Sequence, residues 1–124
     1  MASLTNTVLD AALNVLTTNG DRIDLCTSAP TTYAGISSVS VGNFGSLSIG
    51  SPADRSGGGR EVTVAAVSSG SPGSITAGGT ASHYAISNGS TTLYATGTLS
   101  ADQVVTSGNT FTLASFTIGI PDPA

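Results

Sequence analysis

The sequence predicts a mainly β (α+β) domain with one N-terminal helix, and three features lead to that prediction. An apolar pattern of helical period occurs before Gly20, and after it apolar and small polar residues alternate in short runs. Glycine-rich segments separate these runs, which is typical of an antiparallel β-sandwich or barrel of about 6–8 short strands. We expect a single domain over 1–124, with a helix over 2–19, the β-sandwich over 21–118 and an extended C-terminal arm over 119–124.

The helix is predicted from its two ends and its apolar stripe. Ser3 can act as the N-cap, and Asn19-Gly20 is a favourable stop because glycine tolerates the left-handed conformation just past a helix. The stripe consists of Leu4, Val8, Ala12 and Val15, widened by Leu9, Leu13 and Leu16. We expect this amphipathic helix to lie with that stripe on the rest of the protein.

Alternation with a period of two predicts the first strands. In Arg22–Cys26, Ile23 and Leu25 share one face, so Asp24 is expected on the solvated face. The same alternation continues in Ser38–Val41, Gly45–Ile49 and Glu61–Val67.

A hairpin and a last strand complete the predicted sheet. Asn88-Gly89 suits a two-residue type I′ turn, which sets Tyr84 opposite Leu93 and places both on the apolar face with Ile86. A final strand is expected over Thr110–Ile118. Because proline cannot donate to a strand ladder, the prolines after Ile120 predict the extended arm.

The segment from Pro52 to Arg60 contains three consecutive glycines and is therefore predicted to be a loop. It lacks the Gly-Lys-Ser/Thr ending of a phosphate-binding loop and precedes a strand, which argues against that function. One interpretation is a flexible surface loop. The other is that Asp54, Arg55 and Arg60 form an inter-subunit contact, because they include two of the three fixed cations of the chain.

Charge is scarce throughout the chain. Charged residues make up 8% of the composition, lysine is absent, and the net charge is −4. Three arginines cannot form a basic stripe, so nucleic-acid binding and polybasic membrane contact are not expected. A surface of hydroxyls, small side chains and backbone offers little electrostatic resistance to close packing of identical copies, which favours an assembly component over an enzyme.

No group of residues predicts catalysis. His83 and Cys26 are single in the chain, no Gly-x-Ser-x-Gly elbow occurs, and the aspartates are scattered. We therefore expect a non-enzymatic protein without cofactor or metal. His83 is expected to pack or hydrogen-bond, and Cys26 to be an inert, partly buried thiol.

Several segments resemble small virion proteins of tailed bacteriophages, and this resemblance covers most of the chain. The segments are Ala2–Asn6, Arg22–Cys26 leading to Pro30–Tyr33, Pro52–Arg55, and Val105–Leu113 through Pro121–Pro123. The resemblance implies a capsid decoration, or cement, protein. Its partners would be the major capsid protein and copies of itself as a homo-oligomer, and its location the virion, after synthesis in the host cytoplasm. Alternatives are a neck, tail or fibre component of the virion, a carbohydrate-binding module and, least favoured, a small hydrolase.

In proteins of this kind, terminal arms often reach a neighbouring subunit by strand addition or groove binding. The candidate arms are Met1–Thr5 and Ile118–Ala124. The candidate inter-subunit contacts are Leu4, Thr5, Asp54, Arg55, Arg60, Ile120, Pro121, Asp122 and Pro123.

Overall fold

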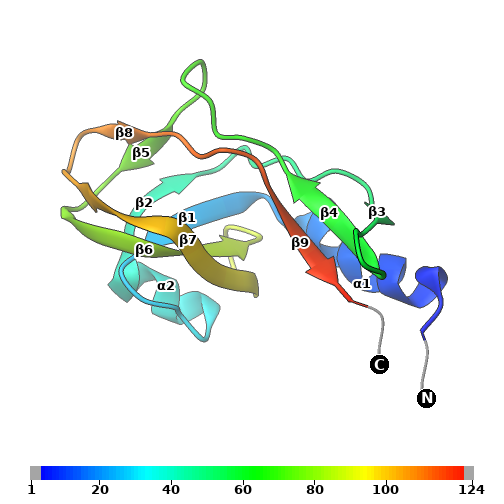
Figure 1. The fold of residues 1–124 in the computed structure, drawn as a ribbon. Coiled ribbons are helices and arrows are strands. Elements are labelled where there is room, and N and C mark those ends of the chain that lie inside the picture. The colour runs from blue at the N-terminus through cyan, green and yellow to red at the C-terminus, as the bar shows by residue number, and fades with distance from the viewer. Residues whose placement is uncertain (1–3, 122–124) are drawn as a thin grey trace.

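The computed structural model describes residues 4–121 and confirms a mainly β fold with antiparallel sheets (Figure 1). Within these residues the order of elements is α1 (Asn6–Asn19), β1 (Arg22–Cys26), α2 (Tyr33–Val39), β2 (Ser40–Phe44), β3 (Ala53–Asp54), β4 (Arg60–Val64), β5 (Gly73–Ile75), β6 (Gly79–Ser87), β7 (Leu93–Val105), β8 (Thr110–Phe111) and β9 (Phe116–Ile120).

The strands form two sheets. Six strands follow the order β7-β6-β1-β2-β5-β8, and three follow the order β3-β4-β9. In the smaller sheet β4 pairs with β9 from Arg60↔Ile120 to Val64↔Phe116. The chain therefore begins the larger sheet with β1 and β2 and then forms β3 and β4 of the smaller sheet. It adds β5 to β8 to the larger sheet and completes the smaller sheet with β9.

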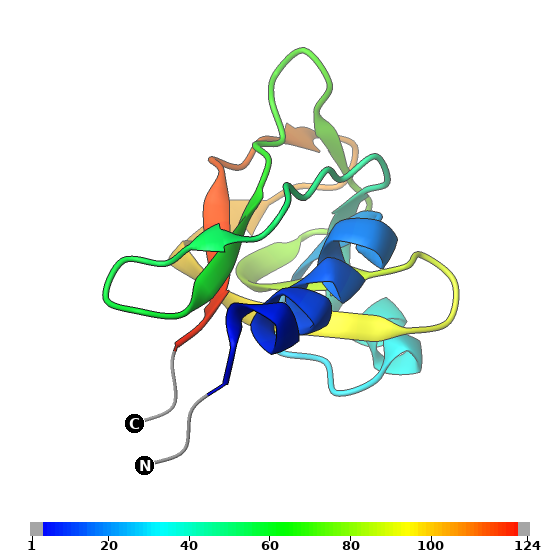
Figure 2. The ribbon, with the colours of Figure 1, turned by 90° about the vertical axis from the view of Figure 1, so that its right-hand side faces the viewer.

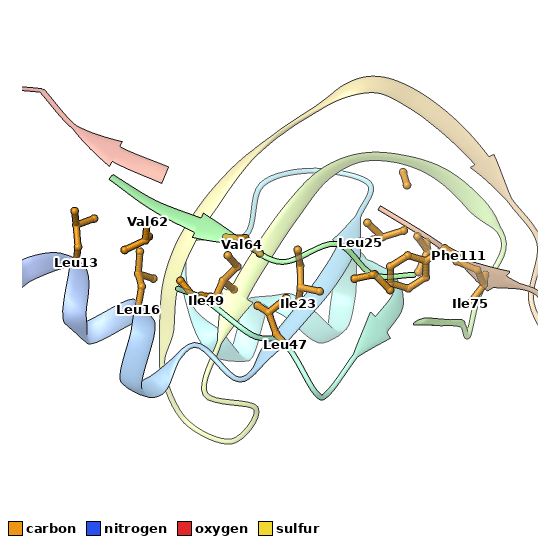
Figure 3. Close-up of a cluster of buried hydrophobic side chains, with 14 residues drawn as sticks. Leu13, Leu16, Ile23, Leu25, Leu47, Ile49, Val62, Val64, Ile75 and Phe111 are labelled. Atoms are coloured by element: carbon orange, nitrogen blue, oxygen red, sulfur yellow. The ribbon is translucent and has the colours of Figure 1, made fainter. Parts of the chain in front are cut away.

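One apolar core joins both sheets and α1 (Figure 3). Ile23 of β1 and Val62 and Val64 of β4 have no exposed surface, and Leu13 of α1 is 2% exposed. Because tryptophan is absent and the buried side chains are mainly aliphatic, the fold depends on close packing of branched side chains.

Helix α1 buries only one part of the predicted apolar stripe. The buried residues are Leu9, Leu13 and Leu16, whereas Val8 and Val15 are about half exposed. Both sets have helical spacing, and only the position of β4 selects the leucines. The helix begins at Asn6 after Thr5 and ends with the Gly20 amide donating to the Leu16 carbonyl at 2.8 Å; the predicted cap, Ser3, lies outside the described residues.

Helix α2 was not predicted, and it covers the second face of the larger sheet. The Thr32 hydroxyl caps it by accepting from the Gly35 amide at 3.1 Å. Ile36 packs on Cys26 and Ala85, which lie on the opposite face of the sheet from the main core. The predicted strand Ser38–Val41 was therefore wrong at its start, because its first two residues end this helix.

The predicted strand Gly45–Ile49 is also absent as a strand. Only an isolated bridge, Ile49↔Val64, occurs there. Leu47 and Ile49 are nevertheless buried, so alternation identified the inward-facing residues without a continuous ladder.

The predicted hairpin register was wrong. Tyr84 lies opposite Gly97 and Ile86 opposite Ala95, because the turn spans residues 88–92 and a register shift between Ile86 and Ser87 adds one more residue. The side-chain oxygen of Asn88 accepts from the amides of Ser90, Thr91 and Thr92 at 2.8–3.1 Å, which stabilises this longer turn. As a result Leu93 packs beneath α2 and not with Tyr84 in the main core.

The C-terminal strand and arm differ from their predicted bounds. Thr110–Ile118 is divided between β8, which pairs with β5, and β9, which pairs with β4. Gly119 and Ile120 belong to β9, so the predicted arm over 119–124 was wrong for its first two residues. Pro121 is exposed and follows the strand, and Asp122–Ala124 lie outside the described residues.

Candidate interaction surfaces

Most of the predicted contact residues gather at one end of the molecule. The start of α1 and the end of β9 lie near each other in both views (Figures 1 and 2). Strand pairing adds the others, because Arg60 lies opposite Asp54 of β3 and opposite Ile120 of β9. We call this region, formed by Leu4, Thr5, Asp10, Asp54, Arg55, Arg60, Ile120 and Pro121, the terminal end.

Arg60 is the centre of the terminal end. Its guanidinium donates to both carboxylate oxygens of Asp10, with Nε–Oδ1 at 2.7 Å and Nη2–Oδ2 at 3.2 Å. It also donates to Asp54 Oδ1 at 2.6 Å and to the Pro52 carbonyl at 3.3 Å. The hydrogen bonds that Arg60 donates to Asp10 and then to Asp54 raise its pKa. This cluster ties α1 to the smaller sheet within one chain.

The two carboxylates of the cluster differ in exposure. The Asp54 side chain is 86% exposed and the Asp10 side chain 30%, while that of Arg60 is 16% exposed. Asp10 therefore serves the fold, whereas most of the Asp54 side chain remains exposed to solvent. Sequence reasoning missed Asp10, although it is the only charged residue of α1.

Arg55 orders the glycine loop between β3 and β4. Its Nη1 donates to the Gly58 carbonyl at 3.0 Å, and its amide donates to the Gly59 carbonyl at 3.0 Å. Gly57, Gly58 and Gly59 all have φ between 88° and 104°, a region that only glycine enters easily. The loop is therefore a defined turn next to the exposed Asp54.

The outward face of α1 is apolar. Val8 is 50% and Val15 44% exposed, and Ala11 and Ala12 between them are also exposed. Leu4, just before the helix, is 46% exposed. The sequence assigned Leu4, Val8, Ala12 and Val15 to the buried stripe, so this surface was missed because the helix is apolar on two sides.

A groove runs between β7 and the segment 110–117. It consists of two hollows of about 430 and 450 Å³ that share Leu99, Ser100, Leu113 and Ala114. Strand β7 bulges here, because Ala81 pairs with Gln103 while His83 pairs with Thr98. The residues that line both hollows are uncharged, and the titratable side chain among them is the phenol of Tyr84, whose pKa is raised by burial.

Asp24 was predicted on the solvated face of β1, but it is fully buried. Arg22 donates to both of its carboxylate oxygens, at 2.9 and 3.1 Å, and the Ser40 hydroxyl donates at 2.8 Å. The hydrogen bond to Asp24 raises the pKa of Arg22. Helix α2 covers this network and leaves a hollow of about 140 Å³ beside it. Its polar atoms are satisfied within the chain, so we assign the network to structure.

The surroundings of Cys26 and His83 do not activate their side chains. Cys26 is fully buried, and desolvation is the main cause that raises the pKa of its thiol to about 12. His83 Nδ1 lies 2.7 Å from the Ser82 hydroxyl, which itself donates to the Thr27 carbonyl. Among the described residues no three histidine, cysteine or acidic side chains are grouped closely enough to hold a metal ion. No helix within residues 4–121 has the length and apolarity needed to cross a membrane.

Comparison with known proteins adds no relative, because no family model, curated protein or solved structure matches the chain.

Proposed function

We propose that the protein is a non-enzymatic structural component of a bacteriophage virion, and that it is a capsid decoration protein. On this proposal it binds the outer shell, contacts the major capsid protein and copies of itself, and stabilises the joints between capsomers. The observation that supports it best is the terminal end, where residues far apart in the sequence meet beside an apolar helix face.

The chemistry of the terminal end suits a contact between proteins. An exposed carboxylate at Asp54, an ordered loop at Arg55 and an exposed proline at Pro121 surround a neutralised arginine. Outside this cluster, fixed positive charge within the described residues is limited to Arg22, which is paired with Asp24. Such a surface binds by shape and backbone contact, and charged groups fix orientation more than affinity.

The first test is the copy number in purified particles, measured by quantitative mass spectrometry against the major shell protein. A ratio equal to a simple fraction of the shell protein is expected for a decoration protein. A trace ratio would instead support the neck, tail or fibre alternative. Absence from particles would refute a virion role.

The second test removes the chain after β9. Deleting Pro121–Ala124 is expected to lower particle occupancy without unfolding the domain, because the strand ends at Ile120. Unchanged occupancy would remove the C-terminal residues from the contact.

A matched pair of substitutions tests the exposed carboxylate. Asp54→Asn at the terminal end is expected to lower occupancy. Asp102→Asn, which removes an exposed charge from β7, is expected to leave particle occupancy unchanged. Equal effects of the two substitutions would contradict a contact at the terminal end.

A further inference from the structure

The outer face of α1 carries an apolar surface that no residue within 4–121 covers. Within residues 4–121 the large hydrophobic side chains that remain exposed are Leu4, Val8, Val15 and Val104; Val8 and Val15 lie on α1 and Leu4 just before it. The exposed alanines Ala11 and Ala12 fill the space between the two valines. We call Val8, Ala11, Ala12 and Val15 the outer patch. Apolar surface grouped in this way commonly marks an interaction site.

The outer patch carries no charge. Asp10 is the only charged residue of α1, and both of its carboxylate oxygens are held by Arg60. The remaining exposed residues of the helix are asparagine and threonine. A charged partner would therefore find nothing to pair with, whereas a second copy would meet no like charge across the contact.

The positions of the outer patch are symmetric along the helix. Val8 and Val15 are equally distant from the midpoint between Ala11 and Ala12. At 100° per residue, Val8 and Val15 differ in direction by only about 20°. If a second α1 lies antiparallel across a two-fold axis at this midpoint, Val8 of each copy lies against Val15 of the other. The alanines then meet at the axis, where small side chains allow two helices to approach closely.

We propose that the outer patch is the contact between two copies of this chain, formed by antiparallel α1 helices around a two-fold axis at Ala11 and Ala12. A two-fold contact requires a surface that is complementary to itself, and the outer patch meets this requirement in position, size and charge. The contact deepens the proposed function, since it supplies one surface for copy-to-copy packing on the shell. It concerns the isolated chain, however, and is tested without particles.

The size of the patch predicts a weak dimer. A standard interface uses about 20–30 residues on each side, and α1 has 14 residues, of which one side is already in the core. We therefore expect a monomer in dilute solution and a dimer at about 10 µM to 1 mM, which is the range of small transient contacts. On a shell, local concentration would favour the same contact.

The test compares the full-length chain with Val8→Glu by sedimentation velocity across that concentration range. Val8 is the third residue of α1, where a glutamate side chain can reach back to the Thr5 amide and interacts favourably with the helix dipole. The substitution therefore places a charge in the outer patch while favouring the helix. We expect the chain itself to associate and Val8→Glu to remain monomeric with an unchanged or higher Tm. Ser71→Glu, in an exposed turn away from α1, is the matched control and is expected to associate like the unsubstituted chain.

Crosslinking tests the antiparallel geometry. In the proposed contact residues 8 and 15 of different copies are adjacent, whereas two residues 8 are about 10 Å apart along the axis. That spacing exceeds what a disulfide spans. Mixing Val8→Cys with Val15→Cys under oxidation is expected to yield the mixed dimer in preference to either homodimer, and buried Cys26 does not compete.

Three outcomes would overturn the proposal: a monomer at 1 mM, association of Val8→Glu equal to that of the unsubstituted chain, or preferential homodimer crosslinks, which indicate parallel helices or a different contact. Binding of the patch only to isolated shell protein would assign it to that partner and equally overturn the proposal. Absence of the protein from particles would refute the virion function without affecting the solution dimer.

Discussion

The two helices lie on different parts of the fold and present different outer surfaces. Helix α1 buries Leu9, Leu13 and Leu16 against the main core and exposes valine and alanine beside asparagine and threonine. Helix α2 buries Ile36 over Cys26 and exposes alanine and serine. Their caps differ as well, because the side chain of Thr32 caps α2 whereas that of Thr5 makes no capping hydrogen bond to α1.

The difference indicates which helix is complete within one chain. The outer residues of α2 include Ser37 and Ser38, whose hydroxyls donate to the Ala34 and Gly35 carbonyls, so this surface is satisfied locally. The outer patch of α1 is apolar, and no residue within 4–121 covers it. A helix that is apolar on two sides is commonly buried on both, and the second burial of α1 is therefore expected to be intermolecular.

The largest expected effect concerns the thiol beneath α2. Burial raises the pKa of Cys26 from 9.0 to about 12, so at pH 8 its thiolate fraction should be about a thousandfold lower than in the unfolded chain. Iodoacetamide should therefore alkylate Cys26 in denaturant and leave it almost unmodified in the folded protein, as measured by mass spectrometry. Equal rates of Cys26 alkylation in the folded and unfolded chain would show that α2 does not protect this thiol.

The same pKa predicts the effect of alkaline pH on stability. The pKa of Cys26 is higher in the folded than in the unfolded chain. The contribution of its protonated thiol to the free energy of unfolding is therefore complete below pH 9 and is lost as pH rises from 9 towards 12. Denaturation curves over that range should show the loss. Cys26→Ala, which removes the titrating group, should show less of it.

The second effect concerns the inner face of α1. Leu13→Ala is expected to lower the free energy of unfolding by about 4 kcal/mol, because it leaves a cavity between α1 and the core. Val15→Ala, on the outer face of the same helix, should change it by less than about 0.5 kcal/mol in dilute solution. Urea denaturation at low concentration measures both, and similar losses would contradict the assignment of the two faces.

The third effect concerns the ion pair beneath α2. Arg22→Ala leaves Asp24 buried with only Ser40 as a side-chain partner. We expect a loss of about 3 kcal/mol, at the lower end for buried pairs because the Arg22 side chain is 34% exposed. Arg55→Ala, whose guanidinium donates to a single loop carbonyl, is the control and should cost clearly less. If Arg22→Ala leaves the free energy of unfolding unchanged, Asp24 is satisfied without the Arg22 guanidinium.

The smallest expected loss of stability concerns the N-caps of the two helices. Thr32→Ala removes the hydrogen bond to the Gly35 amide and is expected to cost about 1 kcal/mol. Thr5→Ala removes no such bond and should cost less, which thermal denaturation of the two variants can resolve. The opposite order would mean that Thr5 caps α1 in solution.

The extent of sequence prediction differs between the fold and the surfaces. The mainly β class, the N-terminal helix, strand β1 and the glycine loop followed from local patterns. Contact candidates at Asp54, Arg55, Arg60 and Ile120 were chosen because charge is scarce and the end of the chain is rich in proline. The structure brings these four together, whereas their role in binding stays a prediction.

One failed prediction had a local cause, and another depended on contacts between distant segments. The Asn88-Gly89 turn was predicted from two residues, but the side chain of Asn88 holds a longer turn and shifts the register. The burial of Asp24 depends on Arg22, Ser40 and the cover of α2, which alternation along β1 cannot reveal.

The sequence by itself determined which residues are apolar, where the chain turns and that charge is rare. These properties reside in single residues and their spacing. Tertiary structure decided which apolar side of α1 faces the core, because Leu9, Leu13 and Leu16 and the residues Val8 and Val15 have equally helical spacing. Only the position of β4 and the Arg60–Asp10 ion pair distinguishes them, and that choice leaves the valines on the surface.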